Sequence, residues 1–185
     1  MKKILLLFVL CSPAYSLQAQ TTRRVNNTPG LNDPNVYATA QAAHDAAVDG
    51  DTIYFEPTGG TDGVNYGGLL LTKRLTLIGP GYYLDKNPNT SFDKRPVRLA
   101  TVIFDNGSTG SKMMGVEVVG GSGGVIIGDS LVTITRCLLI GAVQIVPSGT
   151  LRFGLASNGR STTISNSVLV QISSSGGSGP WEQNH

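Results

Sequence analysis

The chain of 185 residues carries 14 Lys and Arg against 12 Asp and Glu, which gives a net charge of +2. Charged residues make up only 14% of the chain, and no basic stripe indicates a nucleic-acid partner. The length predicts a single domain, and the 24 Gly among many Ser, Thr, Val, Ile and Leu residues predict short strands joined by tight turns.

The beginning of the chain, residues 1–19, has the pattern of a secretory signal peptide. Lys2 and Lys3 form its positive region, and residues 4–10 form an apolar region that is too short to span a bilayer. We expect cleavage after Ala19, with Ser16 as the alternative, and export to the periplasm, the cell surface or the exterior. No later segment is apolar enough to predict a transmembrane segment.

A short Ala-rich helix is predicted at about residues 40–48, after a polar, extended lead-in at residues 20–35. Thr39 is a suitable N-cap and Gly50 a suitable stop. A helix of two to three turns is not stable alone, so its apolar face must rest on another element. The predicted face consists of Ala40, Ala43, Ala47 and Val48, widened by Ala42 and Ala46.

Beyond this helix the chain consists of brief apolar runs separated by Gly, Asn, Asp or Ser. Many runs are continuously apolar, which is typical of buried parallel strands rather than of the alternating strands of a β-sandwich. Two Asn-Gly pairs, at residues 106–107 and 158–159, suit hairpin turns and leave the sandwich open as an alternative. The runs lie at residues 53–55, 69–71, 75–78, 102–104, 113–119, 125–127, 132–134, 137–146 and 168–172.

An internal repeat favours the parallel arrangement, with chance similarity as the alternative. Residues 132–141 (VTITRCLLIG) align with residues 162–171 (TTISNSVLVQ), and residues 112–121 (KMMGVEVVGG) form a weaker copy before them. Such repeats predict units that stack on their neighbours. Cys137, the only cysteine left after signal removal, then lies over Ser167 and is predicted to be a buried filler. The competing interpretation is a surface thiol that pairs between chains.

Three elements follow one another in a recognisable order: the Ala-rich helix, Gly-Asp-Thr-Ile at residues 50–53 and Leu-Thr-Leu-Ile-Gly at residues 75–79. In this order they resemble the start of secreted proteins of the pectin-lyase-like superfamily. The resemblance covers about residues 36–172 and implies an all-β fold, a right-handed parallel β-helix (solenoid) whose N-terminal end the helix plugs. Residues 173–185 would then be a low-complexity tail.

The resemblance also implies where catalytic residues would lie. The Asn-Thr-Asp, Asp-Asp, Gly-His-Gly and Arg-Ile-Lys motifs of the superfamily's hydrolases do not occur in this sequence. Its lyases use Arg or Lys as a base, with acidic residues that hold Ca²⁺. A turn is the plainer interpretation of Asp105 and Asp129. The candidates for a lyase site are Arg136, Arg152, Asp105, Glu117 and Asp129, with Arg98 as a further arginine.

The sequence therefore favours a non-catalytic exported protein that binds polysaccharide or presents a surface at the cell envelope. The alternative is a small or remnant polysaccharide lyase of the pectate or alginate type, the only case in which a cofactor, Ca²⁺, is expected. His44 and His185 are too isolated to predict a metal site. Tyr82 and Tyr83 either anchor a turn or form a platform for sugar stacking. We expect a monomer.

Overall fold

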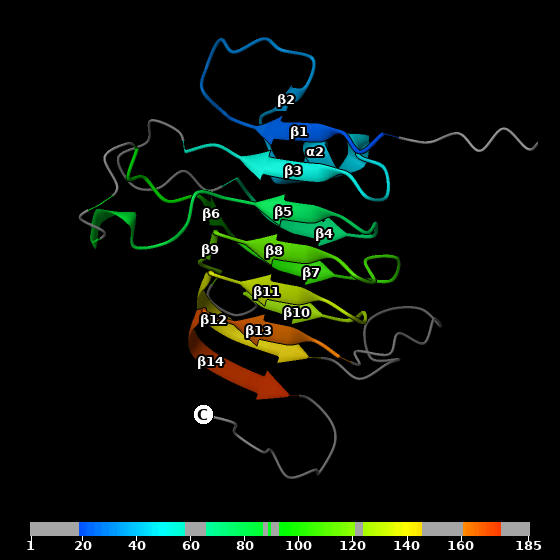
Figure 1. Ribbon diagram of the computed structural model, residues 1–185, viewed down its shortest axis with the longest axis vertical. Coiled ribbons are helices and arrows are strands. Elements are labelled where there is room, and N and C mark those ends of the chain that lie inside the picture. Colours follow the sequence, from blue (N-terminus) through cyan, green and yellow to red (C-terminus); the bar gives the residue numbers. More distant parts are fainter. Residues whose placement is uncertain are drawn as a thin grey trace, which may run out of the picture.

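The computed structural model describes residues 19–57, 66–86, 89, 93–120, 124–145 and 161–174. In these ranges the regular secondary structure is mostly β-strand in two parallel sheets, with one α-helix, α2 (Ala40–Ala46), and one short 3-10 helix, η1 (Leu84–Lys86) (Figure 1). Every strand pairing among the described residues is parallel, as the continuously apolar runs predict. A β-sandwich would need antiparallel pairs, so that alternative is wrong for this part of the chain.

From β3 onward the chain alternates between the two sheets, and we call one crossing of sheet A followed by sheet B a pass. Sheet A has the order β13-β11-β8-β5-β3-β1-β2, so strands from successive passes lie side by side. Its strands are β1 (Thr22–Val25), β2 (Val36–Tyr37), β3 (Thr52–Phe55), β5 (Thr76–Ile78), β8 (Lys112–Met114), β11 (Thr133–Thr135) and β13 (Thr163–Ser165).

Sheet B contains two ladders that the long strand β12 joins. Leu138 and Leu139 of β12 pair with β9, and residues 143–145 pair with β10. The register of β12 against β14 shifts between Leu139 and Ala142, where Gly141 has a φ of 125°, as expected for a β-bulge. The strands of sheet B are β4 (Leu69–Leu71), β6 (Arg98–Leu99), β7 (Val102–Phe104), β9 (Glu117–Val118), β10 (Val125–Ile127), β12 (Leu138–Ile145) and β14 (Val168–Ser174).

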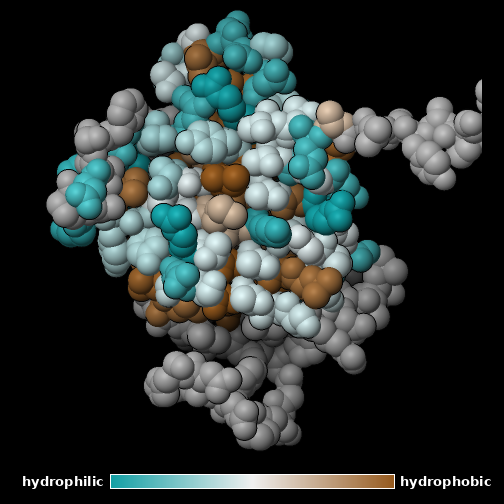
Figure 2. All heavy atoms as spheres, in the orientation of Figure 1, coloured by the Kyte–Doolittle hydropathy of each residue, from teal (hydrophilic) through white to brown (hydrophobic). Residues whose placement is uncertain are grey.

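Side chains alternate between the two faces of sheet A. On the inner face Ile53, Leu77, Met113 and Ile134 follow one another in register, and all four are fully buried. Neighbouring strands lie about 4.8 Å apart, so each column of residues repeats at that spacing. The outer face carries a column of threonines, Thr22, Thr52, Thr76, Thr133 and Thr163, with Lys112 between Thr76 and Thr133. Figure 2 shows this side of the molecule covered largely by residues of intermediate hydropathy.

Left-handed backbone conformations mark the corners before and after the last three strands of sheet A. Glycine adopts this conformation freely, whereas for other residues it costs about 1–2 kcal/mol of conformational free energy. In each of the three passes the two corner residues are five positions apart. The corners before β8, β11 and β13 are at Gly110, Leu131 and Ser161, with φ values of 78°, 57° and 65°. The corners after these strands are at Gly115, Arg136 and Asn166, with φ values of 69°, 54° and 48°.

The repeat between residues 132–141 and 162–171 is confirmed by the strand register. Thr133 pairs with Thr163 in sheet A, and Leu138 pairs with Val168 in sheet B. The weaker copy is displaced by one residue from its predicted alignment, because Thr133 pairs with Lys112 rather than with Met113. A slip of one residue would turn every side chain to the opposite face, so burial of the apolar residues selects the observed register.

Cys137 is fully buried and free, as predicted. Its backbone N–H donates to Ser167 Oγ at 3.2 Å, so the two residues that the repeat aligns lie against each other. Burial raises the pKa of the Cys137 thiol to about 11.

Helix α2 begins where the sequence predicts, because the Thr39 side chain accepts a hydrogen bond from the Ala42 backbone N–H at 3.2 Å. It packs on β4, β1 and β2, with Ala40 and Ala43 fully buried. The helix ends at Ala46 rather than Val48. Ala47 of the predicted apolar face is also buried, but the prediction was wrong for Val48 and for the widening residues Ala42 and Ala46, which are exposed.

His44 takes the place of those residues on the buried face of α2. Its Nε2 accepts the Thr72 backbone N–H at 3.1 Å, and Lys73 Nζ donates to the His44 carbonyl at 2.9 Å. These two bonds tie the helix to the chain just after β4.

The expected lead-in at residues 20–35 includes β1, which lies between β3 and β2 in sheet A. The fully buried carboxylate of Asp51 holds this strand. It accepts the Thr21 backbone N–H at 2.8 Å, the Val48 backbone N–H at 3.0 Å and Arg23 Nε at 3.1 Å. Burial raises the pKa of Asp51, but these hydrogen bonds outweigh burial, so the pKa lies below its usual range.

Candidate ligand-binding groove

The described residues between β5 and β6 lie outside the two sheets, and the chain is again in a strand at Arg98. The beginning of this segment is fixed to the next pass, because the Gly79 N–H donates to the Met114 carbonyl and the Gly81 N–H to the Gly115 carbonyl, both at 2.8 Å. In Figure 1 the coloured parts of this segment stand away from the stacked strands on the side of β6 and β9. The segment forms one wall of two adjoining hollows.

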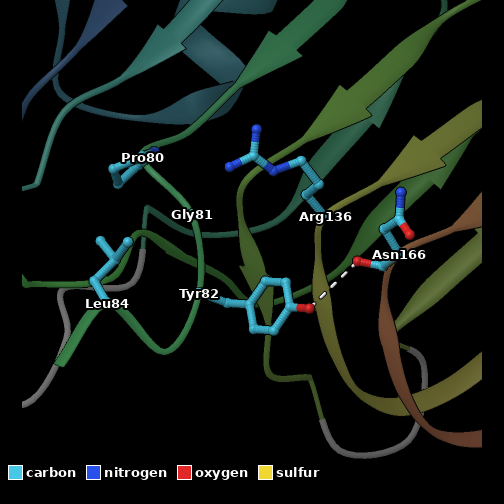
Figure 3. Close-up of a pocket in the computed structure, with 6 residues that line it drawn as sticks. All are labelled: Pro80, Gly81, Tyr82, Leu84, Arg136 and Asn166. Carbon is cyan, nitrogen blue, oxygen red and sulfur yellow. Dashed lines mark hydrogen bonds between the residues drawn. The ribbon is translucent and has the colours of Figure 1, made fainter. Parts of the chain in front are cut away.

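The first hollow, which we call the Tyr82 hollow, has a volume of about 400 Å³. The Tyr82 hydroxyl donates to the Asn166 carbonyl at 3.3 Å and so connects the segment to the corner after β13 (Figure 3). Tyr82 thus anchors the segment, in line with the turn-anchoring role that was one of its two predictions. Its ring also lines the open space of the hollow. The lining residues are Pro80, Gly81, Tyr82, Leu84, Arg136 and Asn166.

Arg136 supplies the charge of the Tyr82 hollow. It occupies the corner after β11, one pass before Asn166, and its side chain is exposed. Figure 3 shows its guanidinium reaching over the hollow from the strands. None of the ion pairs among the described residues includes Arg136. Arg136 also lines a smaller hollow of about 140 Å³, together with Gly79 and Met114.

The second hollow, which we call the Lys94 hollow, has a volume of about 420 Å³ and shares Leu84 with the first. Two of its lining residues form an ion pair, in which Arg98 Nε donates to the nearly buried carboxylate of Glu117 at 2.9 Å. Lys86 pairs with Asp85 at 3.0 Å, and this hydrogen bond holds the pKa of Asp85 below its usual range. The lining residues are Tyr83, Leu84, Asp85, Lys86, Lys94, Pro96, Arg98, Glu117, Leu138 and Ile140.

Tyr82 and Tyr83 place one aromatic ring in each hollow. Their ring centres are 5.4 Å apart and their planes are inclined at 66°, an edge-to-face contact. Tyr83 is 48% exposed, and its φ of 50° turns the chain so that the two adjacent rings serve different hollows. We call the two hollows together the groove: they share Leu84 as a lining residue, and each has one aromatic ring and at least one cationic side chain.

The carboxylates predicted as lyase candidates are engaged in other contacts. Glu117 forms the ion pair with Arg98. Asp105 accepts the Asn106 backbone N–H at 2.8 Å, and Asp129 accepts the Gly107 N–H at 3.1 Å. Both aspartates therefore belong to turns, the plainer interpretation of the sequence.

Of the two arginines predicted as candidate bases, Arg136 lies in the groove. Arg152, like His185 and the Asn-Gly pair at residues 158–159, lies outside the described residues.

Sequence reasoning missed Asn166, Pro80 and Leu84 as lining residues. Asn166 could have been found, because the internal repeat aligns it with Arg136. Pro80 and Leu84 gave no signal, since their role depends on a contact between Tyr82 and Asn166, which lie far apart in the sequence.

Among the described residues no group of three or more His, Cys, Asp or Glu side chains could hold a metal ion. No helix in this part of the chain is long and apolar enough to cross a membrane. Comparisons with protein-family models, with curated proteins and with solved structures found no match to this chain.

Proposed function

We propose that the chain is a right-handed parallel β-helix of the pectin-lyase-like type, exported and then exposed at the cell envelope or outside the cell. The parallel registers, the alternation between two sheets and the constant spacing of the corners support this architecture. The connections between parallel strands of one sheet are right-handed in nearly all proteins, which supports the handedness. Export rests on the signal-peptide pattern of residues 1–19.

The function that we propose for this protein is non-catalytic binding of a polysaccharide in the groove. The observation that carries it is the Tyr82 hollow, which brings an aromatic ring, a guanidinium outside the described ion pairs and an exposed Asn to one open space. A sugar ring has apolar C–H faces that pack on an aromatic ring, and hydroxyls that accept from Arg and exchange hydrogen bonds with Asn. Ligand sites typically combine such an apolar surface with a few polar groups.

The adjoining Lys94 hollow supports an extended ligand. The two hollows meet at Leu84, so a linear chain that fills the first can continue past this side chain into the second. Tyr83 offers the next ring, and Lys94 offers N–H donors. A polymer can occupy both halves at once, whereas a single sugar fills only one.

Binding is measured with the mature chain on a glycan array, followed by calorimetry on the glycans retained. Tyr82→Ala should weaken binding at least about tenfold through lost aromatic contact, and Arg136→Asn should do so through lost charged hydrogen bonds. Asn also tolerates the left-handed conformation of position 136, so the second variant preserves the corner. Tyr54→Ala, which removes a 37% exposed ring on sheet A, is the matched control and should bind normally.

Failure of every glycan to bind would refute the proposal. Equal binding by Tyr82→Ala and the unchanged protein would refute the placement in the groove.

The second candidate function is β-elimination in an acidic polysaccharide, favoured by the position of Arg136 in the groove, outside the ion pairs of the described residues. Incubation with pectate or alginate and Ca²⁺ distinguishes the two, because elimination creates a C=C bond that absorbs ultraviolet light. A non-catalytic protein gives no rise in absorbance. A sustained rise that Arg136→Asn abolishes would establish the lyase instead.

A further inference from the structure

The corner between β7 and β8 contains Asn106-Gly107, a sequence prone to a slow covalent change. Asn106 is exposed at this corner. Gly107 has a φ of 98°, and a Cβ at this position would lie 2.4 Å from the Thr72 carbonyl oxygen. Packing therefore requires glycine after Asn106, and the Asn-Gly pair is built into the corner.

The change begins when the Gly107 backbone nitrogen attacks Asn106 Cγ. A bond forms between this nitrogen and Cγ, the bond from Cγ to the side-chain nitrogen breaks, and ammonia leaves with the proton that the backbone nitrogen gave up. Water then opens the resulting succinimide at either carbonyl, giving Asp or isoaspartate. The reaction needs only water and the loss of the backbone N–H proton, and it is one reason why Asn is thermolabile.

Asp129 acts on the group that must react. Its Oδ2 accepts the Gly107 N–H at 3.1 Å, while its Oδ1 accepts Thr109 Oγ1 at 2.6 Å and the Ser130 N–H at 2.7 Å. Asp129 is 5% exposed. The three hydrogen bonds orient its carboxylate. A carboxylate beside the Gly107 nitrogen opposes loss of the proton, because the anion formed would face a negative charge. The bond also holds the nitrogen in place against the attack.

We propose that Asn106 is a site of isoaspartate formation in this protein and that Asp129 restrains the reaction as long as the corner is closed. The inference is independent of any ligand in the groove. It assigns a role to an aspartate that the sequence marked as a catalytic candidate. Isoaspartate adds a carbon atom to the backbone two residues after β7, next to the place where Gly107 packs on the Thr72 carbonyl, so the change would disturb this contact.

The test follows deamidation at Asn106 by peptide mass spectrometry, in folded and denatured full-length protein, during incubation in mildly alkaline buffer. The native protein should react much more slowly than the denatured one. Asp129→Asn keeps the shape but removes the charge, and it should raise the native rate about tenfold, the factor expected for a weakened hydrogen bond to a charged group. Asn158-Gly159 in the same samples serves as the internal reference and should react equally in the unchanged protein and the variant.

Thr109→Val provides a second arm that leaves the carboxylate in place. It removes one of the bonds that orient Asp129 and should give an intermediate rate, which keeps the test decisive if Asp129→Asn fails to fold. Equal rates in the native and denatured protein would overturn the proposal. An unchanged native rate in a folded Asp129→Asn variant, or in Thr109→Val where the first variant does not fold, would also overturn it.

Discussion

Gly79 and Gly115 lie backbone against backbone in successive passes. A Cβ on Gly79 would stand 2.3 Å from the Gly115 carbonyl oxygen, and a Cβ on Gly115 would stand 2.4 Å from the Gly79 carbonyl oxygen. The contact lies where the chain leaves β5 for the groove segment. The absence of both side chains therefore sets the position of one wall of the groove.

Gly79→Ala should destabilise the fold by roughly 3 kcal/mol or more, because the new methyl group overlaps backbone that cannot move without shifting a strand. Gly68→Ala is the control, since a Cβ there would lie 3.8 Å from its nearest neighbour, the Thr101 carbonyl oxygen. Chemical denaturation of both variants measures the difference. Similar stability of the two proteins would show that the passes are not packed this closely.

Ser108 and Ser111 are both fully buried, yet their hydroxyls differ in their partners. Ser108 Oγ has no hydrogen-bond partner among the described residues, whereas Ser111 Oγ accepts the Leu75 N–H at 3.1 Å. Ser108→Ala should therefore stabilise the protein by about 1 kcal/mol, and Ser111→Ala should destabilise it by about 1–2 kcal/mol. Thermal melts of the pair check the signs, and a loss of stability in Ser108→Ala would contradict the assignment.

Leu131 is 56% exposed and occupies a left-handed corner that holds Gly110 one pass earlier. Leu131→Gly should leave stability unchanged or raise it by up to about 1 kcal/mol, because relief of the backbone offsets the greater freedom of glycine in the unfolded chain. Leu70→Gly serves as the comparison, since Leu70 is 41% exposed within the regular strand β4. That variant should lose stability, and equal losses at both sites would argue against the corner conformation.

Stability should fall in acid partly through Asp51. Its pKa is lowered by folding, so its contribution is present above the unfolded value of about 3.9 and is lost as the pH falls through the lower folded value. Asp51→Asn should be less stable than the unchanged protein at neutral pH and should lose less stability on acidification. Denaturation curves at several pH values measure this, and parallel pH profiles for the two proteins would exclude a role for Asp51.

Cys137 should be unreactive in the native protein, because it is buried and its thiol pKa is raised to about 11. Labelling with a thiol reagent should be slow without denaturant and complete with it. Rapid labelling of the folded protein would contradict burial of this residue. A disulfide-linked dimer on a non-reducing gel would favour the competing surface thiol.

The sequence predicts the strands that carry apolar residues and the helix that Thr39 caps. Hydrophobic periodicity does not predict β1, whose residues are mostly polar and whose place depends on the buried Asp51. It also leaves β6 undetected, because so short a strand shows no pattern. The sequence alignment matches Thr133 with Met113, whereas the sheet pairs it with Lys112. The error arises because an alignment compares side-chain types, while burial of the apolar residues selects the register of the sheet.

The groove was less predictable than the sheets. Tyr82 and Arg136 were noted for their chemistry, but nothing local in the sequence relates them to each other. Their proximity depends on the path of the chain from Gly79 to Tyr82, which the packing of Gly79 and the bond from Tyr82 to Asn166 hold in place. Tertiary contacts of this kind leave no periodic signal.

The segment between the two corners of a pass has a constant length of five positions in the last three passes, whereas the rest of each pass varies in length. Gly110–Gly115, Leu131–Arg136 and Ser161–Asn166 keep this one interval. The passes themselves all differ in length, because successive strands of sheet A pair at Thr52, Thr76, Lys112, Thr133 and Thr163. The differences in length among these passes thus lie outside the segments between paired corners. A new loop can be grafted there, and the groove segment is one such enlargement, so the same scaffold can acquire different recognition surfaces while its sheet A stays unaltered.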